Sequence, residues 1–475
     1  MTGSSPDAAP AVEPLLAPRE GVPPVTASAA ALAEVVARFA AGTGPVAVDA
    51  ERASGYRYSQ RAYLVQLRRK GAGTALVDPI ACPDLSGLSD ALADVEWVLH
   101  AASQDLACLA EVGMVPSAVF DTELAGRLAG FERVGLGAMV ENVLGLHLEK
   151  GHSAADWSTR PLPEAWLVYA ALDVEVLVEL RNALEAELRA QGKLAWAHEE
   201  FEAVRLAPPP APRTDPWRRT SGMHRLRSRR QLAAVRALWE ARDAMARRRD
   251  IAPGRILPDA AIVAAVAAAP SSPEALLEVP VFGGRATRRH VETWYGALQA
   301  AAALPEDRLP QPVPPGDGPP PANRWAERDP VAAARLTCAR RAVTSLAETL
   351  SMPVENLVQP DAVRRLAWQP PAEVDAGSVA DALRRCGARS WQVGLVAGPL
   401  AEALRAKGPL AEGPVAEGPV AEGPVAEVVL AEVVASAGPA AGEPVAAPPV
   451  RAPGRRGPRR ATRAQSGPAA SAPGA

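Results

Sequence analysis

Four acidic residues occupy positions where a carboxylate is costly unless it binds a cation. Asp49 and Glu51 lie in a valine-rich run, Asp105 closely follows a second apolar run, and Asp173 lies in a long helical pattern. Burial disfavours an ionised carboxyl, and neighbouring carboxylates repel each other. A divalent cation would offset both effects, and hard oxygen ligands favour Mg²⁺ or Mn²⁺ over zinc. Tyr169 precedes Asp173 by four residues, so the two should share a helix face.

The first two acids are expected on a buried strand. Residues 45–51 are rich in valine and follow a Gly-Thr-Gly-Pro turn signal. Side chains alternate between the two faces of a strand, so Asp49 and Glu51 should point the same way.

The other two acids are expected at the end of a second strand and on a long helix. Residues 95–100 form another apolar run, and Ser103 is expected to cap the helix that follows, with Asp105 in its first turn. A single helix is expected from about 163 to 190, and it carries Asp173.

Each of these three patterns, taken alone, also has an ordinary structural explanation. An acid in a first helical turn commonly interacts with the helix dipole. A Tyr-x-x-x-Asp pair is commonly a local contact, and an Asp-x-Glu pair on a strand can face solvent. The combination of all three patterns in one domain-sized stretch favours a metal site.

The segments that carry these residues resemble the motifs of a known family. Val-Asp-Ala-Glu at 48–51, His-Ala-Ala-Ser-Gln-Asp at 100–105 and Tyr-Ala-Ala-Leu-Asp at 169–173 are similar to the three exonuclease motifs of the DEDD superfamily, tyrosine branch. Ribonuclease D is matched further by the segments 63–67, 120–122 and 153–162. The resemblance covers roughly residues 26–205. One departure is Ala50, where many relatives have threonine; Ala50 should face away from the carboxylates.

The resemblance implies a two-metal 3′-to-5′ exonuclease on a ribonuclease-H-like α/β fold, a mixed sheet flanked by helices. Asp49 would bridge both ions, Glu51 and Asp173 would hold the ion that carries the attacking water, and Asp105 would hold the other ion. Tyr169 would orient that water or help to deprotonate it. Such ions lie ~3.5–4 Å apart and stabilise both the attacking and the leaving oxygen. The implied substrate is the 3′ end of RNA, including tRNA precursors, with release of 5′-mononucleotides.

Further residues are expected near the substrate: His100, Gln66, Lys150, Trp157 and Arg160. The last three precede the third motif, where phosphate clamping and base stacking would be useful. His100 could touch the terminal nucleotide or be a satisfied structural histidine. Gln66 could make a buried hydrogen bond or contact RNA. Asp121 and Thr122 begin another apolar helix, where capping is the default explanation.

Proline clusters divide the chain into several parts. The expected parts are an N-terminal tail (1–25), the exonuclease domain (26–207), a linker (208–222), an all-helical module (223–303), a Pro-rich linker (304–322), a second helical domain (323–407) and a low-complexity basic tail (408–475). The first helical module, with its longest helix around Arg229 to Arg248, resembles the HRDC domain that RecQ-type helicases share with ribonuclease D. The second is expected to be a further HRDC-like copy. In the tail, Gly-Pro-Val-Ala-Glu recurs every five residues.

Charge is distributed unevenly between these parts. The whole chain has 51 basic and 54 acidic residues, net −3. Residues 26–207 contain 15 basic and 25 acidic residues, whereas residues 223–300 contain 13 and 7. An acidic active site needs affinity for a polyanion from elsewhere, and a basic module would supply it. The expected phosphate contacts are Arg247, Arg248, Arg249, Arg285, Arg288 and Arg289; the alternative is a solvated helical surface.

The remaining features exclude other classes. The four cysteines are widely spaced, which disfavours zinc. No apolar run of 18 residues occurs, and the first 25 residues are too rich in proline and acid for a secretory signal, so a cytoplasmic protein without membrane association is expected. It is expected to act as a monomer without a small-molecule cofactor. The rival functions are a DNA 3′-to-5′ exonuclease and a catalytically inactive nucleic-acid-binding adaptor.

Overall fold

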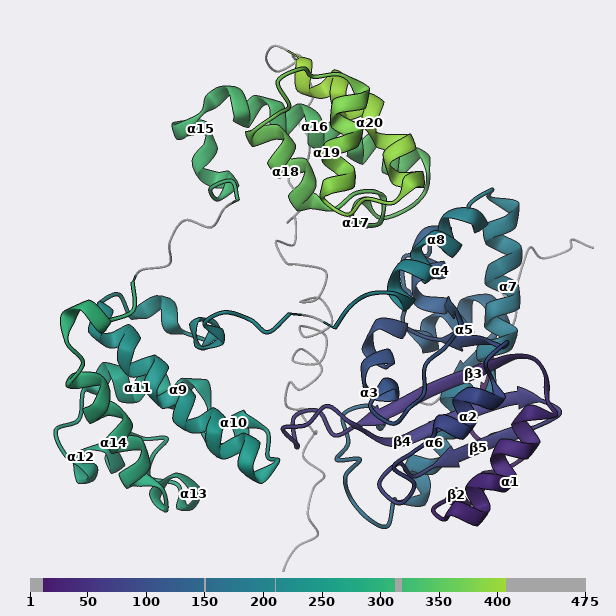
Figure 1. The fold of residues 1–475 in the computed structure, drawn as a ribbon, viewed down its shortest axis with the longest axis horizontal. Coiled ribbons are helices and arrows are strands. Elements are labelled where there is room, and N and C mark those ends of the chain that lie inside the picture. The colour runs from purple at the N-terminus through teal and green to yellow at the C-terminus, as the bar shows by residue number, and fades with distance from the viewer. Residues whose placement is uncertain (1–11, 149–150, 210, 312–317, 407–475) are drawn as a thin grey trace, which may run out of the picture. The chain divides into compact units, whose positions relative to one another are not determined.

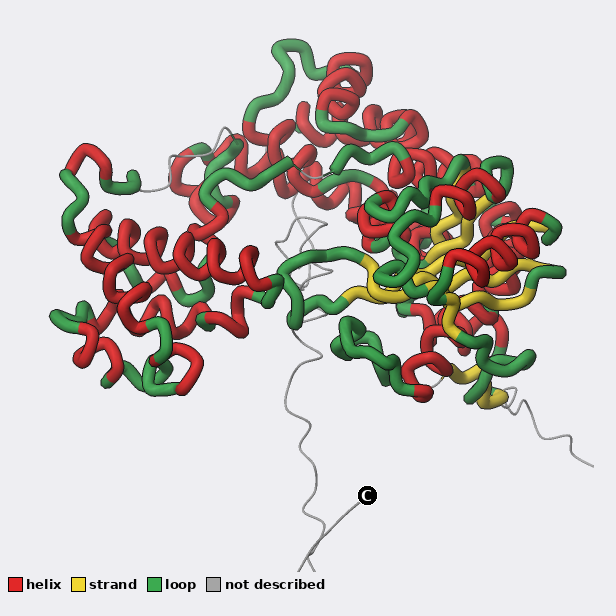
Figure 2. The backbone as a smooth tube through the Cα atoms, turned by 60° about the horizontal axis from the view of Figure 1, so that its bottom comes forward, coloured by secondary structure: helices red, strands yellow, loops and turns green. Residues whose placement is uncertain are grey.

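The protein is described by a computed structural model that covers residues 12–148, 151–209, 211–311 and 318–406. The predicted Gly-Pro-Val-Ala-Glu repeat and basic tail lie outside the described residues. In the described ranges, strands occur only before residue 149, and helices make up the regular structure that follows (Figures 1 and 2). The predicted order, an α/β domain followed by all-helical domains, is confirmed.

A mixed six-stranded sheet forms the centre of the α/β domain. Its strands are β2 (Val25–Thr26), β3 (Thr43–Arg52), β4 (Ala62–Lys70), β5 (Gly73–Val77), β6 (Glu96–Leu99) and β7 (Ala118–Asp121), in the spatial order β2-β5-β4-β3-β6-β7. The strand β3 pairs antiparallel with β4 and parallel with β6. The strand that carries Asp49 and Glu51 therefore lies inside the sheet, between two partners.

Helices cover both faces of the sheet, and side-chain alternation along β3 decides which face each residue meets. Val46, Val48 and Ala50 pack against α1 (Ala29–Ala40), α2 (Ser86–Ala91) and α3 (Leu106–Ala110). Ala47 packs on the opposite face against residues of α6 (Glu164–Glu175) and α7 (Leu177–Ala190). Asp49 and Glu51 have the same parity as Ala47, so they face α6.

The helix predicted from 163 to 190 is two helices. Pro163 is the N-cap of α6, as the sequence indicated, but the backbone leaves helical geometry at Val176, with φ −117° and ψ 4°. Glu175, the last residue of α6, is buried and pairs with Arg68 of β4 at 3.3 Å. The apolar spacing continues across the break because Val174 and Leu177 pack in one cluster, so periodicity could not reveal it.

Three more helices and a pair of strands complete the α/β domain beside the sheet. They are α4 (Thr122–Ala129), α5 (Leu136–Leu144), α8 (Leu194–Arg205) and a two-stranded parallel pair of β1 (Glu13–Leu15) with β8 (Leu146–Leu148). The pair ties the first described residues of the chain to the segment that leads toward the third motif.

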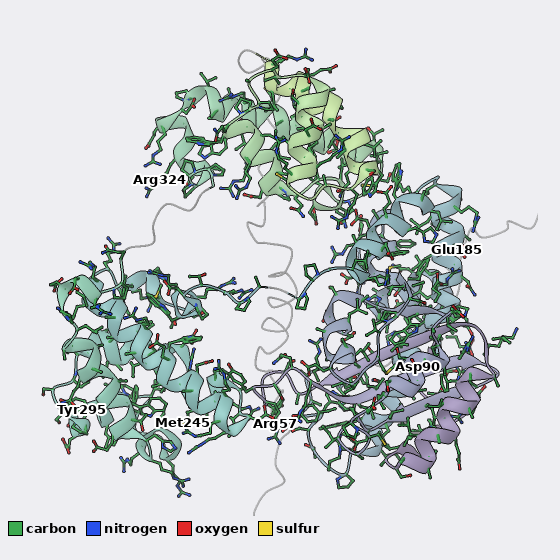
Figure 3. The ribbon with its side chains drawn as sticks, in the orientation of Figure 1. Arg57, Asp90, Glu185, Met245, Tyr295 and Arg324 are labelled. Atoms are coloured by element: carbon green, nitrogen blue, oxygen red, sulfur yellow. The ribbon has the colours of Figure 1, made fainter. Side chains whose placement is uncertain are left out.

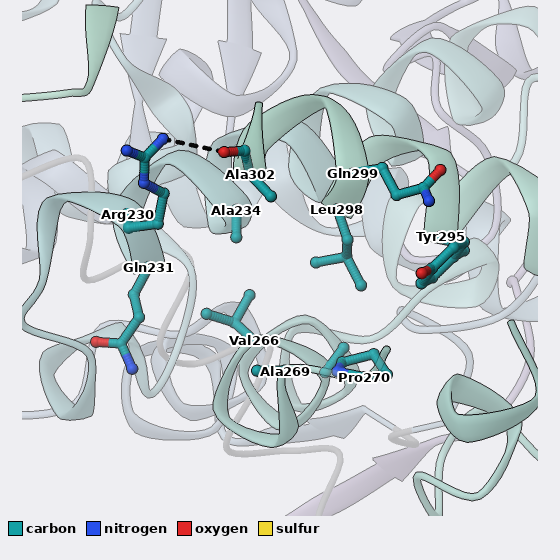
Figure 4. Close-up of a pocket in the computed structure, with 11 residues that line it drawn as sticks. Arg230, Gln231, Ala234, Val266, Ala269, Pro270, Tyr295, Leu298, Gln299 and Ala302 are labelled. Carbon is teal, nitrogen blue, oxygen red and sulfur yellow. Dashed lines mark hydrogen bonds between the residues drawn. The ribbon is translucent and has the colours of Figure 1, made fainter. Parts of the chain in front are cut away.

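The first helical module is built around α9, as predicted. Its helices are α9 (Arg229–Arg249), α10 (Pro253–Ile256), α11 (Asp259–Ala268), α12 (Pro273–Leu277), α13 (Arg285–Arg288) and α14 (Val291–Ala302). Ser228 and Gln231 form a capping box at the start of α9. A cavity of about 280 Å³ lies among these helices and is lined mainly by apolar side chains, including Leu298 (Figure 4). It is lined entirely by residues of this module and contains none of the acidic motifs.

The second helical domain contains α15 (Trp325–Arg328), α16 (Pro330–Thr349), α17 (Val354–Leu357), α18 (Pro360–Trp368), α19 (Ala376–Arg385) and α20 (Ser390–Arg405). Short loops join these helices, and Trp325 and Trp368 pack with their rings 4.9 Å apart. Throughout the described ranges, every helix is too short or too polar to span a membrane.

Candidate metal centre

Three of the four predicted acids converge at the sheet. Asp49 and Glu51 come from β3 and Asp173 from α6, and each offers a carboxylate oxygen that lies within 4.8 Å of the others. Glu51 is 8% exposed, whereas Asp49 and Asp173 remain partly exposed. Strand alternation and the position of α6 on the same face bring them together.

The pKa values of these carboxyls are raised by their surroundings. Burial is the main cause for Asp49, for Glu51 and for Asp173. Repulsion from Asp49 and Asp173 raises the pKa of Glu51 further. A set made only of carboxylate oxygens is a hard-ligand set, and a bound divalent cation would relieve both the repulsion and the loss of hydration. The cluster therefore fits a divalent metal ion.

Asp105 lies beside this cluster but has a different partner. It occupies the N-terminal end of α3, is 4% exposed, and has an Oδ1 atom 3.5 Å from Nη2 of Arg52. Burial, followed by the charge of Asp49, raises its pKa well above the ordinary value. The prediction that Ser103 caps this helix is wrong, because Ser103 lies in the preceding 3₁₀ turn, Ala102–Gln104. Asp105 holds the cap position, without a side-chain capping bond.

Asp121 fixes the turn that leads to Asp105. Its carboxylate caps α4, as expected, by accepting hydrogen bonds from the amides of Glu123 and Leu124. It also accepts hydrogen bonds from the amides of Ala101 and Ala102 at 3.1 and 2.8 Å. Ala101 has a φ of 60°, which is unusual for a residue other than glycine and needs such support. Local sequence rules could find the cap but not this second, long-range role.

Tyr169 is positioned by aromatic neighbours on one side and by Asp173 on the other. Its ring lies 5.9 Å from that of His152, edge-on, and 6.4 Å from that of Trp157. Burial raises the pKa of Asp173, and the nearby Tyr169 hydroxyl opposes that rise. Burial, then the charges of Asp173 and Glu51, raise the pKa of Tyr169, so the phenol keeps its proton. His152 was missed in the sequence, where no pattern distinguished it from other residues of a polar connection.

Two residues expected to contact substrate have structural roles instead. Trp157 is fully buried and donates from Nε1 to the carbonyl of His152, so it cannot stack on a base. Arg160 forms two bonds to Asp78, at 2.8 and 2.9 Å, and its remaining donors reach the carbonyls of Trp157, Thr159 and Tyr63. Its guanidinium donors are therefore all used within the protein. The prediction that Arg160 binds a phosphate is wrong, and Arg160 instead links this connection to Asp78 and Tyr63.

Neighbouring contacts hold the same connection in place. Nε of Arg57, on the loop after β3, donates to Oγ of Ser158 at 2.8 Å. Arg57 is labelled in Figure 3. Lys150, the third residue expected in this connection, lies outside the described residues.

For Gln66 and His100, the structure chooses between the alternatives left open by the sequence. Gln66 is fully buried on β4, opposite Asp49, and its Nε2 donates to Oδ2 of Asp49 at 3.2 Å. It therefore makes the buried hydrogen bond rather than an RNA contact. His100 bonds through Nδ1 to Oγ1 of Thr122 at 2.9 Å, and burial lowers its pKa to about 4. The imidazole is neutral at physiological pH and is tied into the fold.

Because Gln66 holds one oxygen of Asp49, its loss should weaken metal binding. Gln66→Leu should lower the affinity for Mn²⁺ roughly tenfold, since removing a group that orients a ligand typically costs 10–100-fold. Calorimetric titration of Mn²⁺ into the folded variant measures this, with Gln60→Leu, at an exposed loop position, as the control. Equal affinities in the two variants would show that Gln66 does not orient Asp49.

The predicted basic surface of the helical module is partly engaged internally. Arg248 and Arg288 are exposed. Nη2 of Arg249 lies 3.1 Å from Nε2 of His290, and Arg247 pairs with Asp243 at 3.0 Å. The exposed arginines remain candidates for phosphate contact.

Arg52 is the charged residue of the site that sequence reasoning missed. A signal was present, because Arg52 directly follows Glu51. The pairing of β3 with β4 shifts register between Glu51 and Arg52, so strict alternation does not hold at this step, and Nη2 of Arg52 lies 3.5 Å from Oδ1 of Asp105.

Comparison with known proteins agrees with this architecture. A 3′-5′ exonuclease family model matches residues 24–189, an HRDC domain model matches 231–298, and a 3′ to 5′ exonuclease C-terminal domain model matches 318–404. Ribonuclease D of Escherichia coli K12 is 34% identical over 292 residues, which are 60% of this chain and 75% of that protein. The chain belongs to the ribonuclease D family. The ribonuclease D of Granulibacter bethesdensis is 36% identical over 245 residues, or 50% of this chain, which spans only 61% of that relative's length.

Solved structures extend the ribonuclease D match beyond the exonuclease domain. A protein from Bifidobacterium adolescentis superposes with a TM-score of 0.77 at 38% identity, covering 83% of this chain and all of that one. The structure of Escherichia coli RNase D superposes with a TM-score of 0.60 at 28% identity, covering 80% of this chain and 98% of that one. It is described as an exoribonuclease involved in structured RNA processing.

Proposed function

We propose that this ribonuclease D family member is a metal-dependent 3′-to-5′ exoribonuclease that removes single nucleotides from RNA 3′ ends. The observation that carries the proposal is the convergence of Asp49, Glu51 and Asp173, whose oxygens lie within 4.8 Å of one another. Three carboxylates at this spacing repel one another, and a multivalent cation would offset that repulsion.

The proposed reaction is hydrolysis of the terminal phosphodiester. Water attacks phosphorus, the bond from phosphorus to the 3′ oxygen breaks, and that oxygen takes up a proton, which releases a 5′-mononucleotide. Asp49, Glu51 and Asp173 would hold one ion and Asp105, with Asp49, a second. Bound divalent ions, Mg²⁺ or Mn²⁺, would lower the pKa of the water and stabilise the attacking and leaving oxygens.

Tyr169 would orient the attacking water from the side of Asp173. Its phenol is held between the aromatic rings and Asp173, and its raised pKa keeps the hydroxyl as a hydrogen-bond donor. A fixed donor of this kind contributes by positioning rather than by taking a proton at neutral pH. Gln66 would act through Asp49, whose carboxylate it holds, and Asp121 through the turn that leads to Asp105.

The proposed substrates are tRNA precursors and other small structured RNAs, with the chain acting as a monomer and without a small-molecule cofactor. Affinity for the phosphate backbone would come from the basic helical module, through Arg248, Arg249 and Arg288. This division is supported by charge, because the exonuclease domain is acidic and the module is basic.

Cleavage assays on end-labelled single-stranded RNA and DNA test the proposal. With Mg²⁺ or Mn²⁺ we expect a ladder that shortens from the RNA 3′ end, lost on chelation and in Asp173→Asn. Binding without cleavage would instead indicate the inactive adaptor. Equal degradation of DNA would indicate an exonuclease that does not discriminate by sugar.

A further inference from the structure

Arg52 is held differently from the other arginines around the sheet. Arg160 and Arg69 donate hydrogen bonds to backbone carbonyls, and Arg160 also donates two hydrogen bonds to the carboxylate of Asp78. Arg52 has Asp105 as its ion-pair partner within the described part of the chain, at 3.5 Å. A close guanidinium–carboxylate bond is about 2.7–2.9 Å, so this pair is loose.

The guanidinium of Arg52 also retains donors that no described residue uses. No described residue accepts a geometrically good hydrogen bond from it, and its side chain is 25% exposed. None of its nitrogens belongs to the buried side-chain atoms without a partner. Its free N–H groups therefore face a region that solvent or a ligand can reach.

The position of this cation has two electrostatic consequences. It stabilises the ionised forms of Asp49, Glu51 and Asp105, since its charge opposes the rise in each pKa. A divalent cation that approaches Asp105 meets the same positive charge and must displace the arginine or share the carboxylate with it. An anionic phosphodiester that approaches the site meets a planar donor fork suited to phosphate oxygens.

We propose that Arg52 competes with a divalent cation for Asp105 and binds a phosphate oxygen of the RNA with its free donors. This inference rests on the proposed exoribonuclease function for its second half. A cation that binds Asp105 would displace Arg52 from this carboxylate. Arg52 could then donate hydrogen bonds to a phosphate oxygen of the substrate. Arg52 would thereby make metal loading and substrate binding mutually supportive.

The competition predicts effects of opposite sign in one variant. Arg52→Gln removes the competing charge, so Mn²⁺ should bind about tenfold more tightly in calorimetric titration without RNA, comparable in size to other ligand-orienting effects. The same variant should lose roughly 10²-fold in kcat/KM on RNA, because a charge-stabilising donor is gone. Arg52→Lys keeps the charge but not the fork, so its metal affinity should stay near that of the unmodified protein while kcat/KM falls.

Arg189→Gln is the control, because Arg189 is 67% exposed on α7 and pairs only with its helix neighbour Glu185 among the described residues. It should match the unmodified protein in both measurements. The proposal is overturned if Arg52→Gln binds Mn²⁺ no more tightly, or cleaves RNA at the unmodified rate. If the unmodified protein cleaves no RNA, the proposed function fails; the titration still decides the competition, and fluorescence anisotropy with labelled RNA decides the phosphate contact. Should Arg52→Gln not fold, Arg52→Met, which also removes the charge, takes its place in both measurements.

Discussion

Replacing Asp49 by asparagine should reduce RNA cleavage by about 10³-fold or more while the protein stays folded. Asp49 belongs to the three-carboxylate cluster and is the acid that Gln66 orients. Asparagine keeps the size of the side chain but removes its charge, so metal-derived stabilisation of the transition state, worth several kcal/mol, is lost. Single-turnover cleavage of labelled RNA measures the loss.

The matched control for this variant is Asp90→Asn. Asp90 is exposed on α2, away from the cluster, and it is labelled in Figure 3. It should cleave RNA at the unmodified rate. If Asp49→Asn retained more than about a tenth of the activity, the acidic cluster would not be the catalytic centre, and the proposed function would lose its main support.

Divalent metal should stabilise the protein strongly, and increasingly so as the pH rises. The pKa values of Asp49, Glu51, Asp105 and Asp173 are all raised in the folded protein, mainly by burial. With chelator present, the folded state therefore binds more protons than the unfolded state. The stabilisation associated with these protonated carboxyls is present below about pH 4 and is lost as the pH rises through their raised pKa values. A cation at 100 times its Kd adds ~2.7 kcal/mol.

Urea unfolding between pH 5 and pH 8.5, with chelator or with Mg²⁺, measures this linkage. Asp173→Asn, in chelator at pH 8, should be more stable than the unmodified protein by about 1–2 kcal/mol, because one buried like charge is removed. It should also gain less stability from Mg²⁺. A metal response that does not change with pH would show that the four acids are not ionised together on metal binding.

Local chemistry made the centre of the site predictable. The alternation of side chains along residues 45–51 placed Asp49 and Glu51 on one face, and the four-residue spacing placed Tyr169 and Asp173 on another element's face. These predictions depend only on backbone periodicity, which the amino-acid types reveal directly. The family motifs supplied the reason to join the segments.

Contacts between distant segments could not be obtained in the same way. Arg160 was expected to bind phosphate because its position before the third motif was suitable, yet its guanidinium is saturated by Asp78, which lies 82 residues away. Trp157 was expected to stack on a base, yet it is buried under Tyr169 and Trp166. The expected single helix breaks at Val176, where apolar spacing alone gave no sign of an interruption.

The amino-acid sequence by itself determined the types of ligand, the elements that carry them and the order of the domains. Tertiary structure alone decided that Asp105 lies against Arg52, that Gln66 holds Asp49, and that Asp121 supports both a helix and the turn before Asp105. The physical reason is that periodicity fixes which face a side chain occupies, whereas its charge partner depends on which distant backbone the fold places within hydrogen-bonding distance.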